Sequence, residues 1–328
     1  DLLSGGTGID TAVYTGDPGV SIDLRLTIAQ DTGAGRDRLL GIENVALGTG
    51  SNRVTGNAAG NVFYEGGGND MLDGQGGDDT FLVSSEHGPT TFIGGKGFDS
   101  ILGSEGDDLI KLERFDGQYR VERIDGLAGV NVIQAKSATG LKRTYDFSQT
   151  ELLNIAYIQA FSNRQVIGSS GNDVLVGDAS SNYLHGGPGN DVLRGDKGND
   201  YLYGGPGDDT YHFIGGRDFI EDRGLAEDLD RLVLHMPLDL QQIWLVRSGD
   251  NLQIRFDGFT DRVTLVKWFS QPGNRIARIE REDGAYLPVE RVGALLAVMK
   301  GMSSAASNRK AAEQARLQQA LSEAWVMP

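Results

Sequence analysis

The sequence predicts an all-β protein built as a parallel β-roll, a β-helix solenoid, and three observations lead to that prediction. Five nine-residue units run without a gap through residues 168–212. Each unit begins at a glycine and carries an acidic or amide side chain at its sixth place. Each also carries a large apolar side chain at its eighth place. A fixed period of this length is the signature of a solenoid in which every unit forms one turn and one short strand.

The glycine-rich half of each unit suits a sharp turn that binds a cation. Glycine tolerates positive φ and lets backbone carbonyls approach an ion closely. The sixth place adds a side-chain oxygen, and calcium takes six to eight oxygen ligands. The sixth-place residues are Asp173, Asn182, Asp191, Asp200 and Asp209. The carbonyls expected to join them belong to Gly168, Ser170, Gly177, Gly186, Pro188, Gly195, Lys197, Gly204 and Pro206.

Two units complete one coil, so each turn should stack on the turn eighteen residues later. The expected ligand pairs are Asp173 with Asp191, Asn182 with Asp200, and Asp191 with Asp209. Asp218 lies eighteen residues after Asp200 but outside the strict register, and we expect it to close the series. A single such aspartate is more often a turn-forming residue on a solvated loop. Five units in tandem favour the cation site instead.

The eighth place should form an apolar ladder that points into the solenoid. Its members in this block are Leu175, Leu184, Leu193, Leu202 and Tyr211.

A second, less regular block lies upstream. Units that start at Leu47, Gly56, Glu65 and Gly74 place Val54, Phe63, Leu72 and Phe81 eighth. An eleven-residue stretch at 83–93 then replaces one nine-residue half-coil, so Asp79 and Asp99 should form a stretched pair. Asparagine supplies an oxygen without charge, so turns that use it should bind calcium more weakly. The candidate ligands of this block are Asn52, Asn61, Asp70, Asp79, Asp99 and Asp108.

Composition narrows the classes of function. Of 328 residues, 46 are acidic and 30 basic, for a formal net charge of −16. This charge disfavours nucleic acid and anionic membranes as partners and favours divalent cations. Roughly eight calcium ions would cancel the net charge, and we expect roughly four to eight to bind. The absence of cysteine excludes disulfides and thiol catalysis, and no apolar run is long enough for a transmembrane helix.

The period divides the chain into six segments. Residues 112–167 alternate apolar and polar side chains, which we interpret as antiparallel hairpin pairing. A cap is needed after the last repeat because the final coil exposes its apolar ladder and its strand edge. The expected segments are a partial repeat and β lead-in (1–46), the first block (47–111), an antiparallel β spacer (112–167), the second block (168–222), an antiparallel β cap (223–288) and a short helical tail (289–328).

The aromatic residues of the cap have two readings, of which core packing is favoured over a sugar or receptor contact. The aromatic residues are Trp244, Phe256, Trp268 and Phe269, and the aliphatic Ile276 belongs to the same apolar set. Helical spacing of apolar residues then predicts two helices, over 289–299 and 308–325, joined by a linker at 303–307. The second helix is either a docking helix or an uncleaved C-terminal export signal, and the sequence favours neither reading.

The repeats resemble those of the RTX (repeats-in-toxin) family. The resemblance rests on the two Gly-Gly-x-Gly-x-Asp blocks, the lead-in Gly41-Ile42-Glu43-Asn44-Val45 and the cap segment Asn251-Leu252-Gln253-Ile254-Arg255-Phe256. Residues 209–269 are similar to the C-terminal end of the adenylate cyclase toxin and related haemolysins. Membership would imply calcium binding, export through a type I secretion apparatus and folding outside the cell.

The resemblance implies the C-terminal calcium-binding region of a secreted toxin, located extracellularly or on the bacterial surface. The terminal module of an adhesin and the C-terminal module of a secreted hydrolase remain open alternatives. Candidate partners are a host-cell receptor and upstream toxin domains, since the chain opens within a repeat and should continue a longer protein. No His-Glu-x-x-His, Gly-x-Ser-x-Gly or phosphate-loop motif occurs, so we expect no catalytic site here.

Overall fold

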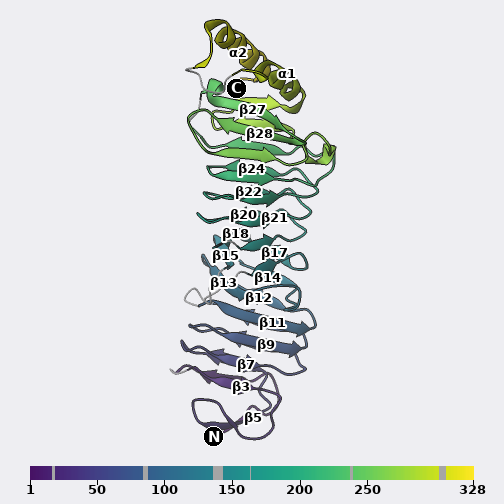
Figure 1. Cartoon of the computed structure of the whole chain (residues 1–328). Coiled ribbons are helices and arrows are strands. Elements are labelled where there is room, and N and C mark those ends of the chain that lie inside the picture. Colours follow the sequence, from purple (N-terminus) through teal and green to yellow (C-terminus); the bar gives the residue numbers. More distant parts are fainter. Residues whose placement is uncertain (17–18, 84–87, 136–142, 163, 237–238, 303–307) are drawn as a thin grey trace. The chain divides into compact units, whose positions relative to one another are not determined.

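The chain folds as two compact units, residues Asp1–Gln159 and Ala160–Pro328, each of which stacks short β-strands into coils (Figure 1). The computed structural model describes residues 1–16, 19–83, 88–135, 143–162, 164–236, 239–302 and 308–328. The expected parallel β-roll with a helical tail is confirmed. The linker expected at 303–307 lies outside the described residues.

Unit 1 is built from two sheets of parallel strands. The first sheet follows the order β17 (Glu151–Leu153), β14 (Arg123–Asp125), β12 (Ser100–Leu102), β10 (Thr80–Leu82), β8 (Val62–Tyr64), β6 (Asn44–Leu47) and β2 (Thr11–Tyr14). The second follows β3 (Ser21–Asp23), β7 (Arg53–Thr55), β9 (Met71–Gly76), β11 (Thr90–Lys96), β13 (Leu109–Arg114), β15 (Asn131–Ala135) and β18 (Ile155–Ala160). A small sheet of β1 (Leu2–Ser4), β5 (Arg36–Leu40) and β4 (Gln30–Asp31) lies at the N-terminus, and β16 spans Thr144–Asp146.

The strand register of unit 1 stacks like residues into apolar ladders. Val54 pairs with Leu72, and Phe63 pairs with Phe81, each across eighteen residues. All four side chains are fully buried. The rings of Phe63 and Phe81 stack with their centroids 5.4 Å apart. The eighth place of each unit therefore supplies the core, as its period predicted.

The antiparallel spacer expected at 112–167 is not what the structure contains. Strand β13 pairs with β15 in parallel, and β14 pairs with β17 in parallel. Alternation of apolar and polar residues fixes which side chains face inward, but it does not fix the direction of the neighbouring strand. The coils simply lengthen here, so that Ile124 pairs with Ile101 across 23 residues rather than eighteen.

Unit 2 repeats the two-sheet coil and then closes it. One sheet follows β19 (Gln165–Ile167), β21 (Tyr183–His185), β23 (Tyr201–Tyr203), β25 (Arg217–Ile220), β29 (Arg262–Leu265), β28 (Asn251–Phe256) and β27 (Ile243–Ser248). The other follows β20 (Val174–Val176), β22 (Val192–Arg194), β24 (Thr210–Phe213), β26 (Arg231–Leu234), β30 (Arg278–Arg281) and β31 (Tyr286–Pro288). The pairs β27–β28, β28–β29 and β30–β31 are antiparallel.

The cap aromatics mostly pack in the interior. Trp244, Phe256 and Trp268 are buried, as is Ile276, which agrees with the core-packing reading. Phe269 is only partly buried, and the guanidinium of Arg247 lies over its ring at 4.2 Å from the centroid.

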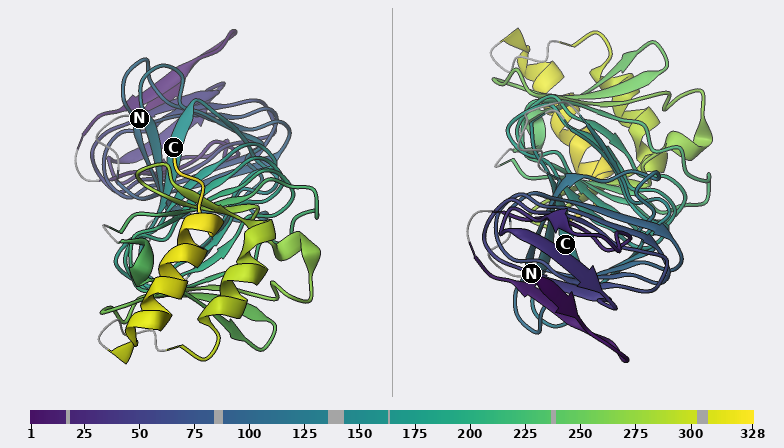
Figure 2. Two further views of the ribbon diagram at one scale, coloured as in Figure 1. Left: turned by 90° about the horizontal axis from the view of Figure 1, so that it is seen from above. Right: turned by 90° about the horizontal axis from the view of Figure 1, so that it is seen from below.

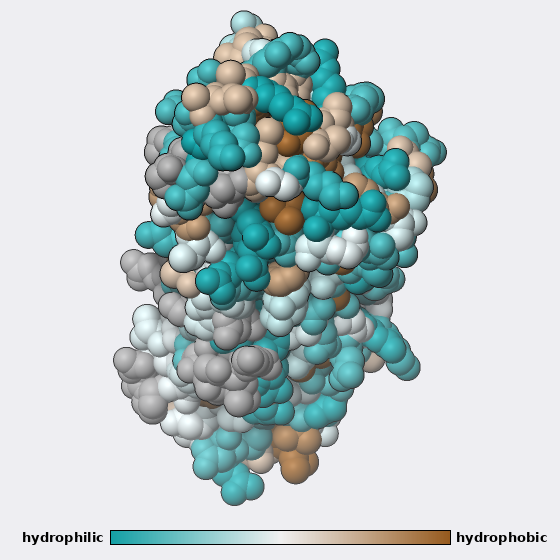
Figure 3. Space-filling view, turned by 45° about the horizontal axis from the view of Figure 1, so that its top comes forward, coloured by the Kyte–Doolittle hydropathy of each residue, from teal (hydrophilic) through white to brown (hydrophobic). Residues whose placement is uncertain are grey.

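Two helices complete unit 2, and Figure 2 shows them side by side. Helix α1 spans Val289–Met299 and buries Val292, Leu295 and Met299. Helix α2 spans Ala311–Ala324 and buries Leu317, Leu321 and Ala324. Short 3-10 turns η1 (Leu240–Gln242) and η2 (Pro272–Asn274) lie in the cap. Among the described residues, no helix has the length and apolar character needed to cross a membrane. Polar residues predominate on the face drawn in Figure 3, with apolar residues in small patches.

Candidate metal centre

The turns between strands bring backbone oxygens close to the glycines of the next coil. Gly187 has φ +112°, and a Cβ placed on it would lie 2.5 Å from the carbonyl oxygen of Ser169. Gly189 has φ +131°, and a Cβ there would collide with the carbonyl oxygen of Gly171. Only glycine combines this backbone conformation with so close an approach. The glycines are therefore required by the stacking of one turn on another.

In unit 2 the sixth-place side chains form a continuous ladder along each edge of the solenoid. We call each of these side chains a rung. One carboxylate oxygen of an aspartate rung accepts the backbone N–H of the rung residue in the preceding coil. The bonds run from Asp173 to Asp191 (2.8 Å), Asn182 to Asp200 (2.8 Å), Asp191 to Asp209 (2.8 Å) and Asp200 to Asp218 (3.0 Å). The structure thus brings together the sequence pairs and places Asp218 on the ladder.

The same ladder is present in unit 1. The backbone N–H groups of Asn52 and Asn61 each donate to a carboxylate, of Asp70 and Asp79, at 2.7 Å. The stretched pair also forms, since the Asp79 N–H donates to Asp99 at 2.8 Å across 20 residues.

Three rungs were missed by sequence reasoning because the coils there are longer than eighteen residues. Glu122 accepts from the Asp99 N–H, and Asn131 accepts from the Asp108 N–H, each across 23 residues. Asp230 accepts from the Asp209 N–H across 21 residues. A usable signal existed, because each missed residue stands two places before a fully buried aliphatic side chain, as a sixth-place residue stands before an eighth-place one.

The second carboxylate oxygen of many rungs is buried without a hydrogen-bond donor in the part of the chain that the structure describes. Leaving a buried carboxylate oxygen unsatisfied is costly, so such atoms call for a missing partner. The clearest cases are the Oδ2 atoms of Asp79, Asp99, Asp191, Asp200 and Asp209.

Backbone oxygens converge on the same positions. A Cβ placed on Gly186 would meet both the Oδ2 of Asp191 and, at 2.8 Å, the carbonyl oxygen of Gly204. Of the carbonyls expected to be ligands, Gly204 and Pro206 each also accept one backbone N–H bond, from Gly187 and Gly189 at 2.9 Å. A carbonyl has a second lone pair, so this bond leaves it able to bind a cation. Carboxylate and carbonyl oxygens together are the donor set that calcium prefers.

Two acidic rungs differ, because a serine of their own loop donates to the carboxylate. The Oδ2 of Asp173 accepts from both the backbone N–H and the hydroxyl of Ser169, at 2.6 and 3.0 Å. In Asp108 the N–H of Ser104 donates to Oδ2 at 2.6 Å and the Ser104 hydroxyl donates to Oδ1 at 2.9 Å. A serine at the second place of the unit thus closes the turn internally.

The asparagine rungs of unit 1 are satisfied from within the protein, whereas the Nδ2 of Asn182 in unit 2 is buried without a hydrogen-bond partner among the described residues. The side-chain NH₂ of Asn61 donates to the carbonyl of Glu43 at 2.7 Å. That of Asn52 donates to the carbonyl of Gly50 at 2.7 Å. At Asn52 and Asn61 an amide N–H group donates to a backbone carbonyl, whereas an aspartate would place a second oxygen against that carbonyl. These two rungs therefore need no cation.

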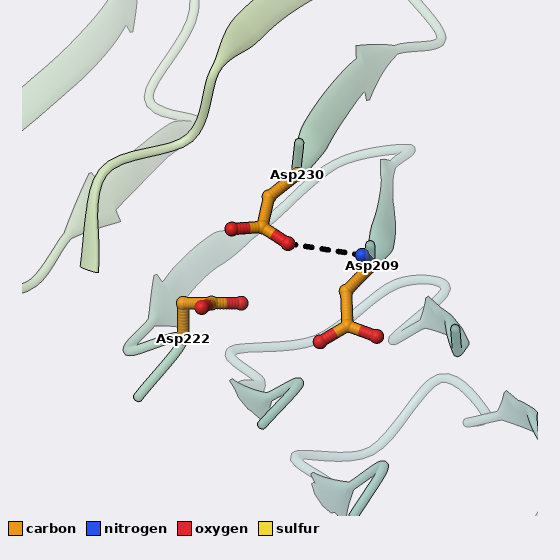
Figure 4. Close-up of side chains that lie close together, drawn as sticks. All are labelled: Asp209, Asp222 and Asp230. Carbon is orange, nitrogen blue, oxygen red and sulfur yellow. Dashed lines mark hydrogen bonds between the residues drawn. The ribbon is translucent and has the colours of Figure 1, made fainter. Parts of the chain in front are cut away.

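A denser cluster closes the ladder at the cap. Carboxylate oxygens of Asp209, Asp222 and Asp230 all lie within 4.8 Å of one another, and all three residues are buried (Figure 4). The hydroxyl of Tyr211 donates to Asp222. Asp222 and Asp230 were not anticipated from the sequence, because they follow the last strict repeat.

Burial and mutual repulsion raise the pKa of these carboxyls. Removal from water is the largest cause throughout, and neighbouring carboxylates add to it. The pKa is raised to about 7 for Asp191 and Asp200 and to about 9 for Asp209. It is raised to about 8 for Asp230, where Asp222 is the main neighbouring charge. A cation at these oxygens would favour their ionised form.

The fold and the site define a β-solenoid whose stacked turns offer buried oxygens to divalent cations. The family model for the RTX calcium-binding nonapeptide repeat matches the chain four times, at residues 47–81, 88–119, 165–193 and 185–220. The segments that it matches are therefore RTX calcium-binding nonapeptide repeats, as the resemblance implied. Comparison with curated proteins gives no match.

Proposed function

We propose that this chain is the calcium-binding C-terminal region of a type I-secreted protein, and that extracellular calcium switches it from a disordered to a folded state. The observation that supports the proposal is the row of buried carboxylate oxygens without donors. Folding without a cation would leave these oxygens unsatisfied and their charges close together. The ion-free fold is therefore disfavoured at neutral pH.

Calcium would be held by the aspartate rungs together with the turn carbonyls. In the bound state it would neutralise the carboxylates and replace their missing donors. The aspartates with this role are Asp70, Asp79, Asp99, Asp191, Asp200, Asp209 and Asp230. Asp218 and Asp222 would add further carboxylate oxygens to the same sites. Since such a site exists only in the folded chain, binding and folding are one equilibrium.

Location would set the state of the chain. Extracellular calcium modules bind at about 10⁻⁴–10⁻³ M, far above cytosolic calcium concentrations. Inside the cell the acidic repeats would stay extended and fit a narrow export channel. Outside, folding of the part that emerges first would oppose its return.

Assignment to a toxin rests on the resemblance of residues 209–269 to the haemolysin-type C-terminal end. The same switch would serve an adhesin or a secreted hydrolase. The solenoid itself is a structural module, and the role proposed for its surface is to bind a receptor or to scaffold upstream domains.

The test is a calcium titration of the chain followed by far-UV circular dichroism, with Asp209→Asn and Asp208→Asn compared. Both variants lose one negative charge from the same loop, but Asp209 is fully buried whereas the Asp208 carboxylate accepts the N–H of Leu229 in an exposed bond. We expect β-structure to appear with calcium, at a several-fold higher concentration for Asp209→Asn only. A spectrum already folded in chelator and insensitive to calcium would overturn the proposal.

A further inference from the structure

Two histidines and a glutamate form a connected group on unit 2, away from the acidic turns. His212 lies on β24, while His235 and Glu282 directly follow the neighbouring parallel strands β26 and β30. The Nδ1 of His212 lies 2.6 Å from the Nε2 of His235. The Nδ1 of His235 lies 2.7 Å from a carboxylate oxygen of Glu282.

The chemistry of the group places a single proton between the two rings. The ionised Glu282 carboxylate can only accept, so the Nδ1 of His235 carries a hydrogen. A nitrogen pair at 2.6 Å must share one proton, whichever ring holds it. Burial, followed by the charges of His235, Arg231 and Arg194, lowers the pKa of His212 to about 4. His212 is thus neutral near pH 7, and one of its ring nitrogens has a lone pair that can bind a proton or a metal ion.

The surroundings leave room beside the pair. A pocket of about 470 Å³ is lined by both histidines, Glu282 and the side chains of Val174 and Val192. His235 is 29% exposed and Glu282 is 59% exposed, so both can adjust. Both histidines therefore border a pocket large enough for a small ligand.

We infer that His212 Nδ1 and His235 Nε2 form a binding site for a divalent transition-metal ion such as Zn²⁺, distinct from the calcium turns. The ion takes the place of the shared proton, which leaves to solvent or moves to the Nε2 of His212. Glu282 acts as a positioning residue that fixes the tautomer and orientation of His235, as carboxylates commonly do behind metal-bound histidines. The remaining coordination positions face the pocket and are open to water or a small ligand.

The geometry requires a small opening of the pair. Two nitrogens bound to a tetrahedral zinc at about 2.0–2.1 Å lie about 3.3 Å apart. The rings must therefore separate by about 0.7 Å from their present 2.6 Å. The exposed carboxylate of Glu282 can follow this movement.

Ligand chemistry separates this site from the calcium sites. Imidazole nitrogen suits zinc, copper and nickel, whereas calcium prefers the oxygens of the turns. The guanidinium groups of Arg194 and Arg231 oppose a cation here, although Arg194 is also paired with Asp196 at 2.8 Å. Because the site has only two protein ligands and lies near two positive charges, its affinity for zinc should be lower than that of four-ligand structural zinc sites.

The experiment is isothermal titration of the full chain with ZnCl₂ in saturating calcium, which keeps the chain folded and the turns occupied. One Zn²⁺ per chain should bind to the parent protein. His212→Gln and His235→Gln should each lose this binding, and Glu282→Gln should weaken it about tenfold. Cobalt absorption in the visible range should show nitrogen ligation in the parent and lose it in both histidine variants.

His185→Gln is the matched control. His185, like His212, holds the ninth place of its nonapeptide unit, but its Nε2 lies 3.2 Å from the side chain of Gln165 and its ring stacks on Tyr203. It should bind Zn²⁺ as the parent does. An unchanged calcium midpoint in His235→Gln confirms that loss of zinc binding is not loss of folding. Absent zinc binding in the parent, or equal binding in the parent and in His235→Gln, overturns the inference.

Discussion

Single side chains determine which turns require a cation. An aspartate rung leaves one buried oxygen without a donor, as at Asp79 and Asp191. An asparagine rung turns an NH₂ group toward a neighbouring carbonyl, as Asn61 does toward Glu43. The two residue types have nearly the same shape, so the difference is one of charge and hydrogen-bond direction. The expectation that asparagine turns bind calcium more weakly acquires a structural reason, although occupancy stays a prediction.

Asn61→Asp should therefore convert a self-satisfied rung into a calcium-dependent one. The new oxygen would face the Glu43 carbonyl at the position of a 2.7 Å hydrogen bond, and the two would repel each other without a cation. We expect a lower melting temperature in chelator and one additional bound calcium in calorimetric titration. Asn57→Asp makes the same charge change at a side-chain oxygen that accepts from the Ala59 N–H at 2.8 Å and from the Asn61 amide at 3.5 Å. An aspartate there can accept the same bonds, so this variant should show neither effect. Unchanged stoichiometry in Asn61→Asp would contradict this account.

At the scale of the element, the turn and the strand of each unit depend on each other. Strand pairing sets the spacing of the coils, and the turns must then pass close to one another. Gly187 shows this, because its positive φ and the Ser169 carbonyl both exclude a side chain. The stacked turn is therefore a property of neighbouring coils rather than of one loop.

Gly187→Ala should destabilise the folded chain by about 1–3 kcal/mol, the usual cost of forcing such a backbone conformation on a residue with a Cβ. Urea unfolding in saturating calcium measures this loss. Gly171→Ala is the control in the preceding coil, since its Cβ would meet only the Ser169 hydroxyl at 3.6 Å and no positive φ is involved. Equal stability of the two variants would show that the close approach of the turns is unimportant.

The cap is the second element whose packing should control folding. Trp244 is 4% exposed, and the Arg309 guanidinium lies over its ring at 5.2 Å from the centroid. Trp244→Ala should cost about 3–5 kcal/mol, as for other large core side chains. Because folding and calcium binding are linked, its calcium midpoint should rise. Phe259→Ala removes an aromatic ring that is 49% exposed, and it should leave both quantities almost unchanged.

At the scale of the whole molecule, the strict nonapeptide period was sufficient to predict the solenoid, its core and its ladder pairs. Leu175, Leu193 and Tyr211 share one ladder because the spacing is constant. Prediction was incomplete where insertions changed the spacing. Glu122 and Asp230 then lost their register although their local pattern was intact. The antiparallel pairing predicted for 112–167 was wrong, since parallel and antiparallel strands share the same alternation.

Lower pH should stabilise the folded state of the ion-free chain, but it should weaken calcium binding. The buried aspartates have pKa values above their usual value of 3.8, for example about 7 for Asp200 and about 9 for Asp209. The folded state then binds more protons than the unfolded state, so its stability falls as pH rises. This contribution is complete below about pH 4 and is lost progressively up to about pH 9. Calcium needs the ionised carboxylates, so its midpoint concentration should instead rise as pH falls.

Circular dichroism in calcium-free buffer at pH 5 and pH 8 tests the first half of this prediction, and calcium titrations at the same pH values test the second. We expect more β-structure at pH 5 without calcium, and a higher calcium midpoint at pH 5 than at pH 8. Added salt separates the buried rungs from general surface repulsion, because it screens exposed charges strongly and buried ones weakly. If high salt at pH 8 restores the fold without calcium, repulsion across the acidic surface, rather than the buried carboxylates, keeps the ion-free chain unfolded.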